Sequence, residues 1–283
     1  MFGVVHLPLM NIILVGYTPE RTRRAIAFCE LTFGKLPLRH RVLVLNRAEA
    51  PVPEEATGWE VVRGSNTLGE FSGWQEGLAR LSDLGEQDAV VFVNDTVGAY
   101  QHMSVFRRWC LAREIRSMSA NRMVGFTQDS TGLHGALTVR GLPAYPFVPT
   151  FCFALPYQVL VKLELRLWNG AEVESCVHGG TDKDRFFTEE VSPALREHLK
   201  WWLFEGWHRS EPLDAGSEER LRFKAHCIFA EFLLSAHCRR LGVELRDPLK
   251  HHPVARALEA LNGVRYEMVQ RLKFRPDQHG STT

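Results

Sequence analysis

Three polar residues, Asn94, Asp95 and Thr96, end an apolar run that begins after Asp88. A short, continuous run of this kind is typical of a strand that is buried on both faces of a sheet. In open α/β sheets, ligands bind at the carboxyl ends of the strands. Asp95 is therefore a candidate ligand-binding residue. The alternative is that its side chain caps the turn or helix that follows the strand.

Two further carboxylates could act as a general base, which removes a proton from a reacting hydroxyl. Glu231 lies in the apolar segment 228–234, where burial would raise its pKa toward neutral pH unless a cation pairs with it. The alternative for Glu231 is a structural ion pair that ties a late helix to the core. Asp129 lies in a polar loop after Phe126, and a solvated, turn-forming role is the alternative there.

The elements that must position these residues alternate between strands and helices in the first half of the chain. Apolar runs predict strands at 11–16, 41–46, 59–63 and a fourth that ends at Asp95, and periodicity predicts helices at 19–31 and 70–81. Thr18 is expected to be the N-cap of the first helix, with Pro19 at its first position. This succession predicts a mainly parallel sheet with right-handed crossovers.

The second half of the chain is predicted to add mostly helices. We expect a helix at 103–116, a strand at 122–126, a loop at 127–132, a mixed segment with several prolines at 136–163, and helices at 192–204 and 218–241. Ser217 is the expected N-cap of the last helix. The predicted fold class is therefore α/β: a Rossmann-type, mainly parallel sheet flanked by helices, with a C-terminal helical extension. The expected core is 1–190, and the expected helical region at 191–283 packs on it within one structural domain.

Composition and charge narrow the class of protein. The chain has 283 residues, of which 45% are hydrophobic and 24% charged, as is usual for a globular protein. Its 34 Lys and Arg residues against 33 Asp and Glu residues give a net charge of +1, so no overall field would attract nucleic acid. Six scattered cysteines without a Cys-x-x-Cys spacing favour a reducing, cytoplasmic compartment.

No segment is predicted to span a membrane. The apolar N-terminus lacks the basic region and the small-residue cleavage site of a signal peptide. The longest later apolar run, 147–163, is interrupted by Pro149, Pro156 and Lys162 and is too short. The tail carries a positive bias between Lys250 and Arg275, which would either support peripheral attachment to the inner face of an anionic membrane or form a solvated helix face.

Several motifs occur in the order found in nucleotide-sugar glycosyltransferases of the GT-A fold. The segment 61–74 and the strand that ends at Asp95 resemble the Asn-x-x-Gly, glycine-containing helix and strand-Asp series of that family. More narrowly, the chain is similar to the bacterial surface-polysaccharide group typified by the rhamnan-synthesis F proteins. Later motifs of that group resemble, in order, the segments 125–130, 151–160, 231–235 and Gly242. The likeness spans roughly residues 11 to 242, and the order of the motifs carries it.

The resemblance implies a GT-A-like fold in which Asp95, next to Asn94, binds the phosphate of a nucleotide-sugar through Mg2+ or Mn2+. Hard divalent cations held by carboxylate stabilise the charge that grows on a leaving phosphate. This chain has a single carboxylate in Asn94-Asp95-Thr96, whereas metal-dependent members have Asp-x-Asp. A phosphate bound by Arg side chains and helix N-termini would need no ion.

The resemblance also implies that further polar and small residues contact the nucleotide. Asn66, at a strand end, is favoured as a ligand contact. By the topology of the sheet alone, Gly16 and Tyr17 at the end of the first strand would lie near the base and ribose. Gly73 falls inside a predicted helix, where glycine costs about 1 kcal/mol relative to alanine. For Gly69 and Gly73, close packing and backbone approach to the nucleotide are equally good explanations.

The predicted function is transfer of a sugar from a nucleotide-sugar donor to a glycan or lipid-linked glycan acceptor of a growing bacterial surface polysaccharide. Glu231 and Asp129 are the candidate catalytic residues. The alternative is a catalytically silent subunit of the same fold that binds or assembles a polysaccharide-synthesis complex. A nucleotide-dependent oxidoreductase is disfavoured, because Gly16-Tyr-Thr-Pro follows the first strand in place of Gly-x-Gly-x-x-Gly.

Overall fold

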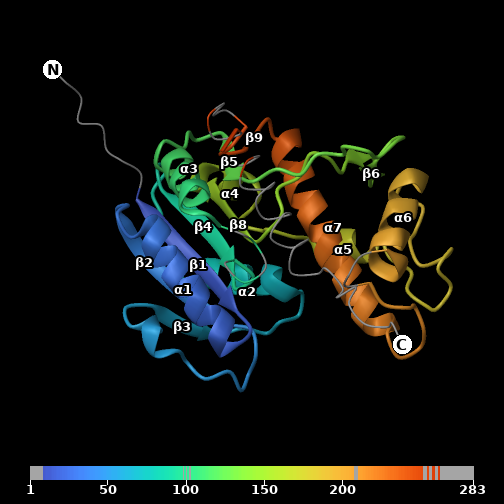
Figure 1. The fold of residues 1–283 in the computed structure, drawn as a ribbon, viewed down its shortest axis with the longest axis horizontal. Coiled ribbons are helices and arrows are strands. Elements are labelled where there is room, and N and C mark those ends of the chain that lie inside the picture. Colours follow the sequence, from blue (N-terminus) through green and yellow to red (C-terminus); the bar gives the residue numbers. More distant parts are fainter. Residues whose placement is uncertain are drawn as a thin grey trace, which may run out of the picture.

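The protein is built around one seven-stranded sheet flanked by helices (Figure 1). The computed structural model describes residues 9–97, 99, 101, 103–206, 210–250, 254, 257, 258 and 261. The strand order is β3-β2-β1-β4-β8-β5-β9. The strands are β1 (Met10–Gly16), β2 (Leu38–Leu45), β3 (Glu60–Arg63), β4 (Ala89–Asn94), β5 (Arg122–Gly125), β8 (Cys152–Pro156) and β9 (Glu244–Arg246). Only β8 runs antiparallel to its neighbours β4 and β5 in this sheet. The predicted α/β class with a mainly parallel sheet is therefore confirmed.

Helices cover both faces of this sheet. They are α1 (Pro19–Phe33), α2 (Gly69–Leu78), α3 (Val105–Arg116), α4 (Tyr157–Lys162), α5 (Gly170–Glu174), α6 (Pro193–Lys200) and α7 (Glu218–Arg240). A short 3-10 helix, η1 (Glu54–Ala56), a π-helix, η2 (Trp201–Glu205), and a two-stranded sheet of β6 (Thr138–Val139) and β7 (Leu142–Pro143) complete the described elements.

The alternation of side chains along β1 separates two cores. Ile12 and Leu14 pack in one hydrophobic cluster with residues of α1 and α3. Ile13 and Val15 pack in the other, with residues of α2 and α7. Successive strand residues point to opposite faces, so one fully apolar strand supplies both clusters. The helix pair α1 and α3 and the helix pair α2 and α7 thus lie on opposite faces of the sheet.

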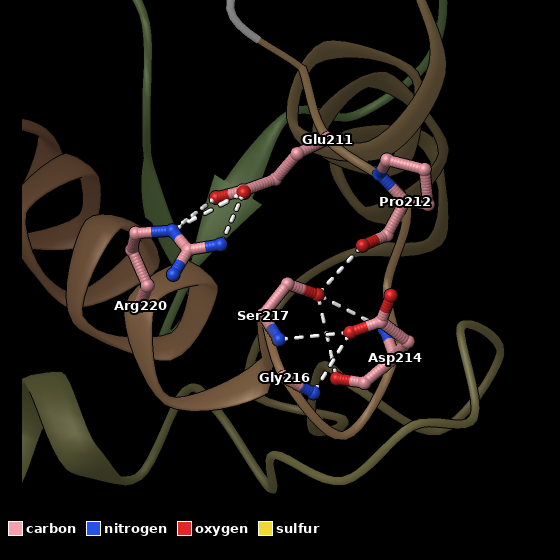
Figure 2. A network of polar contacts seen from close by, with 6 residues as sticks. All are labelled: Glu211, Pro212, Asp214, Gly216, Ser217 and Arg220. Atoms are coloured by element: carbon pink, nitrogen blue, oxygen red, sulfur yellow. Dashed lines mark hydrogen bonds and ion pairs between the residues drawn. The ribbon is translucent and has the colours of Figure 1, made fainter.

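The predicted first-half elements agree with the structure to within a few residues. The caps differ from expectation. Thr18 precedes α1 as predicted, but its side chain makes no capping hydrogen bond. Ser217 likewise makes none at the start of α7. In the loop before α7, Asp214 Oδ1 accepts hydrogen bonds from the backbone N–H groups of Gly216 (2.8 Å) and Ser217 (2.9 Å) (Figure 2).

The Ser217 side chain is turned back toward the loop. Its hydroxyl donates to the carbonyl oxygen of Pro212 at 2.6 Å (Figure 2). The Asp214 carbonyl accepts from the backbone N–H of Glu218 at 2.9 Å. Ser217 therefore occupies the predicted N-cap position of α7, but its side chain does not cap the helix, because its hydroxyl is bonded to the preceding loop.

The mixed segment 136–163 contains β6, β7, β8 and α4. The C-terminal half adds helices α6 and α7, and it also supplies β9, which pairs in parallel with β5 at the sheet edge. All six cysteines are free thiols. Within the described residues, none of the helices has the length and apolar character needed to cross a bilayer.

Candidate functional site

Asp95 joins the ends of two neighbouring parallel strands. Its side chain is fully buried just after β4, and its Oδ2 accepts hydrogen bonds from the backbone N–H groups of Tyr17 (2.7 Å) and Thr18 (3.2 Å), which follow β1. Burial raises the pKa of Asp95, and these two hydrogen bonds oppose the rise. The carboxylate therefore orders the turn between β1 and α1, in addition to lying at the sheet edge where ligands bind.

The other oxygen of Asp95 has no described partner. Oδ1 is buried, and no described residue donates a hydrogen bond to it. A buried carboxylate oxygen without a donor is unfavourable, since ionised acceptors are normally satisfied. Oδ1 is therefore the atom of Asp95 that a donor or a cation would satisfy.

Asn94 organises the backbone around Asp95. Its Oδ1 accepts from the backbone N–H of Thr96 at 3.0 Å and from the Thr96 hydroxyl, which is an Asx turn. Its Nδ2 donates to the carbonyl of Thr150 at 3.4 Å. The side chain thus connects β4 with the residue that lies two positions before β8.

Two carboxyl groups from distant helices meet at Thr150. Glu231 of α7 accepts a hydrogen bond from the backbone N–H of Thr150 at 3.0 Å and also contacts the Thr150 hydroxyl. The same hydroxyl lies 3.3 Å from Oε1 of Glu70, in the first turn of α2. Glu70 and Glu231 keep part of their surface accessible. The predicted helical carboxylate therefore has a second acid beside it.

The pKa values of both carboxyl groups are raised. Burial, and then the charge of Glu70, raises the pKa of Glu231 to about 7, against the opposing effect of the Thr150 hydrogen bonds. Burial also raises the pKa of Glu70. Two acids that share one hydroxyl resist simultaneous ionisation. A carboxylate with a pKa near the working pH is suited to general base catalysis.

Asn46, at the end of β2, gathers several of the predicted site residues. Its Nδ2 donates to the carbonyl of Gly69 at 2.7 Å and lies 3.3 Å from the Tyr17 hydroxyl and 3.5 Å from Oδ1 of Asn66. Burial, followed by the charge of Glu70, raises the pKa of Tyr17. Tyr17, Asn66 and Gly69 therefore belong to the same polar cluster as Glu70.

The predicted glycines have packing roles. A Cβ on Gly73 would lie 2.8 Å from Cγ2 of Val15, which keeps α2 close to β1. A Cβ on Gly16 would collide with the Thr22 side chain. Gly69 adopts a φ of +52°, and a Cβ there would lie 2.9 Å from the sulfur of Cys227 in α7. Gly69 thus allows α2 to begin against α7, next to the Glu70 carboxyl.

Asp129 is placed differently. Its carboxylate is about half exposed and pairs with Nζ of Lys250 at 2.6 Å. No described contact joins it to Glu231, Glu70 or Asp95. The structure therefore brings Glu231 into the cluster around Asp95 and Asn94 and leaves Asp129 in a surface ion pair.

Three members of the cluster were not predicted: Glu70, Thr150 and Asn46. Glu70 directly follows Gly69 and is the acidic residue of the first turn of α2, so its position beside the motif could have indicated it. Asn46 ends an apolar strand in the same way that Asn94 does, which was a usable signal. Thr150 carried no signal, because the mixed segment around it has no clear period.

The described residues do not form a metal-binding group. Across residues 9–250, leaving aside the positions that the structure does not describe, no group of three or more His, Cys, Asp and Glu side chains is arranged to hold an ion. Asp95 offers one unpartnered oxygen. Dependence on Mg2+ or Mn2+ therefore stays a prediction.

Comparison with known proteins gives distant similarities in fold. No protein-family model matches the chain, and no curated protein sequence matches it. A mannosyltransferase from Pyrobaculum calidifontis, solved in complex with GDP-Man and Mn2+, is 11% identical, with a TM-score of 0.41 over 92% of this chain and 81% of that one. A 4-diphosphocytidyl-2C-methyl-D-erythritol synthase is 13% identical, with a TM-score of 0.34 over 79% of this chain and 98% of that one. Both TM-scores are below 0.5.

Proposed function

We propose that this protein is a GT-A-type glycosyltransferase that transfers a sugar from a nucleotide-sugar to a growing bacterial surface polysaccharide or a related glycan. The observation that carries the proposal is the acid pair of Glu231 and Glu70 at Thr150, next to the carboxyl ends of β1 and β4. The motif order described above supports the family. We expect the enzyme to act in the cytoplasm, at the inner face of the membrane.

Glu231 is the proposed general base. In a direct displacement, the oxygen of the acceptor hydroxyl bonds to the anomeric carbon of the donor sugar. The bond from that carbon to the phosphate oxygen breaks, and its electron pair leaves with the nucleotide. The hydroxyl proton passes to the Glu231 carboxylate. Glu70 is the proposed positioning residue, because its charge contributes to holding the pKa of Glu231 near neutral.

The turn between β1 and α1 is the proposed nucleotide contact. Asp95 orders this turn by accepting hydrogen bonds from Tyr17 and Thr18. Asn66 is linked to the Tyr17 side chain by Asn46, whose amide nitrogen contacts both. Donor binding should therefore depend on Asp95 in two ways: through the shape of the turn and through its unpartnered Oδ1. A metal ion, if bound there, would supply charge neutralisation to the leaving phosphate.

A thermal-shift series with UDP, GDP, dTDP and CMP, each with and without Mn2+, tests donor binding. Ligands that bind the native state raise its melting temperature by mass action. One nucleotide should raise it, and Asp95→Asn should abolish the rise while leaving the unliganded protein folded. If no nucleotide shifts the melting temperature, the proposal fails.

A turnover assay separates the enzyme from the silent subunit. Glu231→Gln should lower nucleotide release from the matching nucleotide-sugar by roughly 100-fold or more, as expected on loss of a general base. Glu231→Asp, which keeps a carboxylate, should retain part of the activity. The single strand-end carboxylate favours the alternative of a silent binding subunit. Saturable nucleotide binding without turnover in the wild-type protein would establish that alternative.

A further inference from the structure

A groove lies between the C-terminal end of α1 and the outer face of α3, on the opposite sheet face from α2 and α7. Its volume is about 610 Å³. The outer face of α3 contributes residues spaced three and four apart, namely Val105, Arg108, Trp109, Ala112, Arg113 and Arg116. This spacing places them along one stripe of the helix. The inner face holds the buried residues Leu111 and Ile115.

The stripe exposes apolar side chains. Val105 is 74% exposed, Trp109 is 52% exposed, and Leu31, which lines the groove from α1, is 73% exposed. Single exposed apolar residues are ordinary, but three around one groove form a patch that requires an explanation. Trp109 stacks with Phe106, with ring centres 5.9 Å apart, and still exposes half of its surface to solvent.

The charged residues around this patch have one sign. Lys35, Arg108, Arg113 and Arg116 line the groove, and none of its described lining residues is acidic. The nearest acids on the two helices are paired elsewhere: Glu30 with Arg41 at 2.8 Å, and Glu114 with Arg246 at 3.0 Å. The net charge of the whole chain is +1, so this is a local concentration of positive charge.

We propose that the α1–α3 groove docks on the surface of an anionic lipid bilayer. At a membrane interface, Trp and aliphatic side chains enter the boundary region while Arg and Lys side chains contact the headgroups, and the outer face of α3 offers both kinds of side chain. The Arg113 guanidinium lies 5.4 Å from the centre of the Trp109 ring, which places a cation and an interfacial aromatic side by side.

Lipid fits this surface better than a soluble polyanion does. A nucleic acid would meet the cations but would leave Leu31 and Val105 in water. A bilayer removes that apolar surface from water and also neutralises the cations, each of which contributes about 1 kcal/mol near an anionic membrane. The proposal is independent of the proposed nucleotide site, which is at the carboxyl ends of β1 and β4 and shares none of the groove's lining residues.

Vesicle sedimentation of the full-length chain tests this proposal. The protein should bind vesicles of phosphatidylglycerol and phosphatidylcholine, and bind vesicles of phosphatidylcholine alone much more weakly. Arg108→Glu/Arg116→Glu should lower the partition coefficient at least tenfold, and added salt should weaken wild-type binding. Trp109→Ser should lower it severalfold. Nucleotide-induced thermal shifts should be unchanged in these variants, which separates this result from the fate of the proposed function.

Matched controls carry the same chemical changes elsewhere. Arg80→Glu/Arg166→Glu reverses two exposed cations on the other sheet face, and Trp201→Ser removes an indole that is also 52% exposed. Both controls should bind vesicles as the wild type does.

The proposal is overturned if the controls lose binding equally or if wild-type protein ignores anionic vesicles. It is also overturned if Arg271→Glu/Arg275→Glu in the tail abolishes binding while the groove variants keep it, or if a DNA oligonucleotide is bound in place of vesicles. Melting curves of each variant exclude unfolding as the cause of a loss.

Discussion

The carboxylate of Asp95 accepts a 2.7 Å hydrogen bond from the backbone N–H of Tyr17, so the strand-end acid after β4 holds the chain that leaves β1. A residue predicted from sequence as a ligand contact is thus also a structural link. The two roles make different demands on the side chain. An acceptor oxygen is enough for the backbone N–H groups, whereas an interaction with a cation or phosphate depends on the charge.

Asp95→Asn and Asp95→Ala should separate these roles. Alanine leaves the N–H groups of Tyr17 and Thr18 without an acceptor, and we expect a loss of roughly 2–4 kcal/mol in the free energy of unfolding. Asparagine keeps an acceptor oxygen and should cost less than half of that. Both variants should lose the nucleotide-induced thermal shift. Urea denaturation measures the first effect, and an asparagine variant that binds nucleotide normally would contradict a ligand role for the Asp95 charge.

Glu70→Gln and Thr150→Val should move the pKa of Glu231 in opposite directions. The charge of Glu70 raises this pKa, so its removal should lower it. The Thr150 hydroxyl lowers it, so loss of the hydroxyl should raise it. Since the proposed base acts when ionised, the acidic limb of the pH profile of kcat/KM should move down in pH in the first variant and up in the second.

Thr150→Ser is the control for this pair, because it keeps the hydroxyl and should leave the acidic limb in place. A carbon-13 titration of the Glu side chains reads the same pKa without turnover. If the pKa of Glu231 moved in the same direction in Glu70→Gln and Thr150→Val, the coupling of Glu70 and Glu231 through Thr150 would be contradicted.

Glu231→Gln should change how stability depends on pH. The pKa of Glu231 is about 7 in the folded protein and 4.5 ordinarily, so the folded state binds the proton more tightly. This carboxyl therefore makes the wild type lose stability as pH rises from about 4.5 to 7, with no further change above. The variant should lack this slope and be more stable than the wild type at pH 8 by at most about 3 kcal/mol. Denaturation at pH 5 and pH 8 measures the difference, which should be small at pH 5.

Three glycine variants should separate backbone strain from crowding. Gly58 has a φ of +82° and open space around it, so Gly58→Ala should cost only strain, about 1 kcal/mol. Gly73→Ala crowds Val15 and should cost roughly 1–3 kcal/mol. Gly69→Ala carries both a positive φ and a 2.9 Å approach to Cys227, so it should cost the most. Urea denaturation gives the order, and a Gly69→Ala variant as stable as Gly58→Ala would show that α7 yields at this contact.

Asp214→Ala should destabilise the start of α7 in a pH-dependent way. The backbone N–H groups of Gly216 and Ser217 lower the pKa of Asp214. A lowered pKa means that the stabilisation is present above the ordinary value of 3.8 and is lost as pH falls through the folded-state value. The melting temperature of the variant should therefore fall below that of the wild type at pH 7 and approach it at pH 3. An equal deficit at both pH values would indicate that the ionised carboxylate is not the cause.

The sheet was predictable because its central strands are apolar on both faces. The runs that became β1, β2 and β4 appear in the sequence as continuous hydrophobic segments, and Thr18-Pro19 marks the start of α1. The antiparallel β8 and the edge strand β9 were not predicted. β9 is three residues long with no buried side chain, so its pairing with β5 leaves no hydrophobic pattern.

The candidate site was predictable where a residue ends a strand or interrupts an apolar helix. Asp95, Asn94 and Glu231 have such signals, and the structure joins Asn94 and Glu231 at Thr150. The contact between Glu231 and Glu70 could not be foreseen, because the two residues lie 161 positions apart in the sequence, on different helices. Asp129 had the weakest signal, a polar loop, and its described partner is Lys250.

The pairing of β9 with β5 has a consequence for synthesis on the ribosome. Residues 122–125 are made long before 244–246, so one edge of the nascent sheet stays open while more than a hundred residues are added. An uncovered strand edge is a site for wrong pairing with another chain. We therefore expect the native sheet to be completed only after translation has passed residue 246. Until then, the open edge of β5 is the part of the nascent chain that most needs chaperone protection.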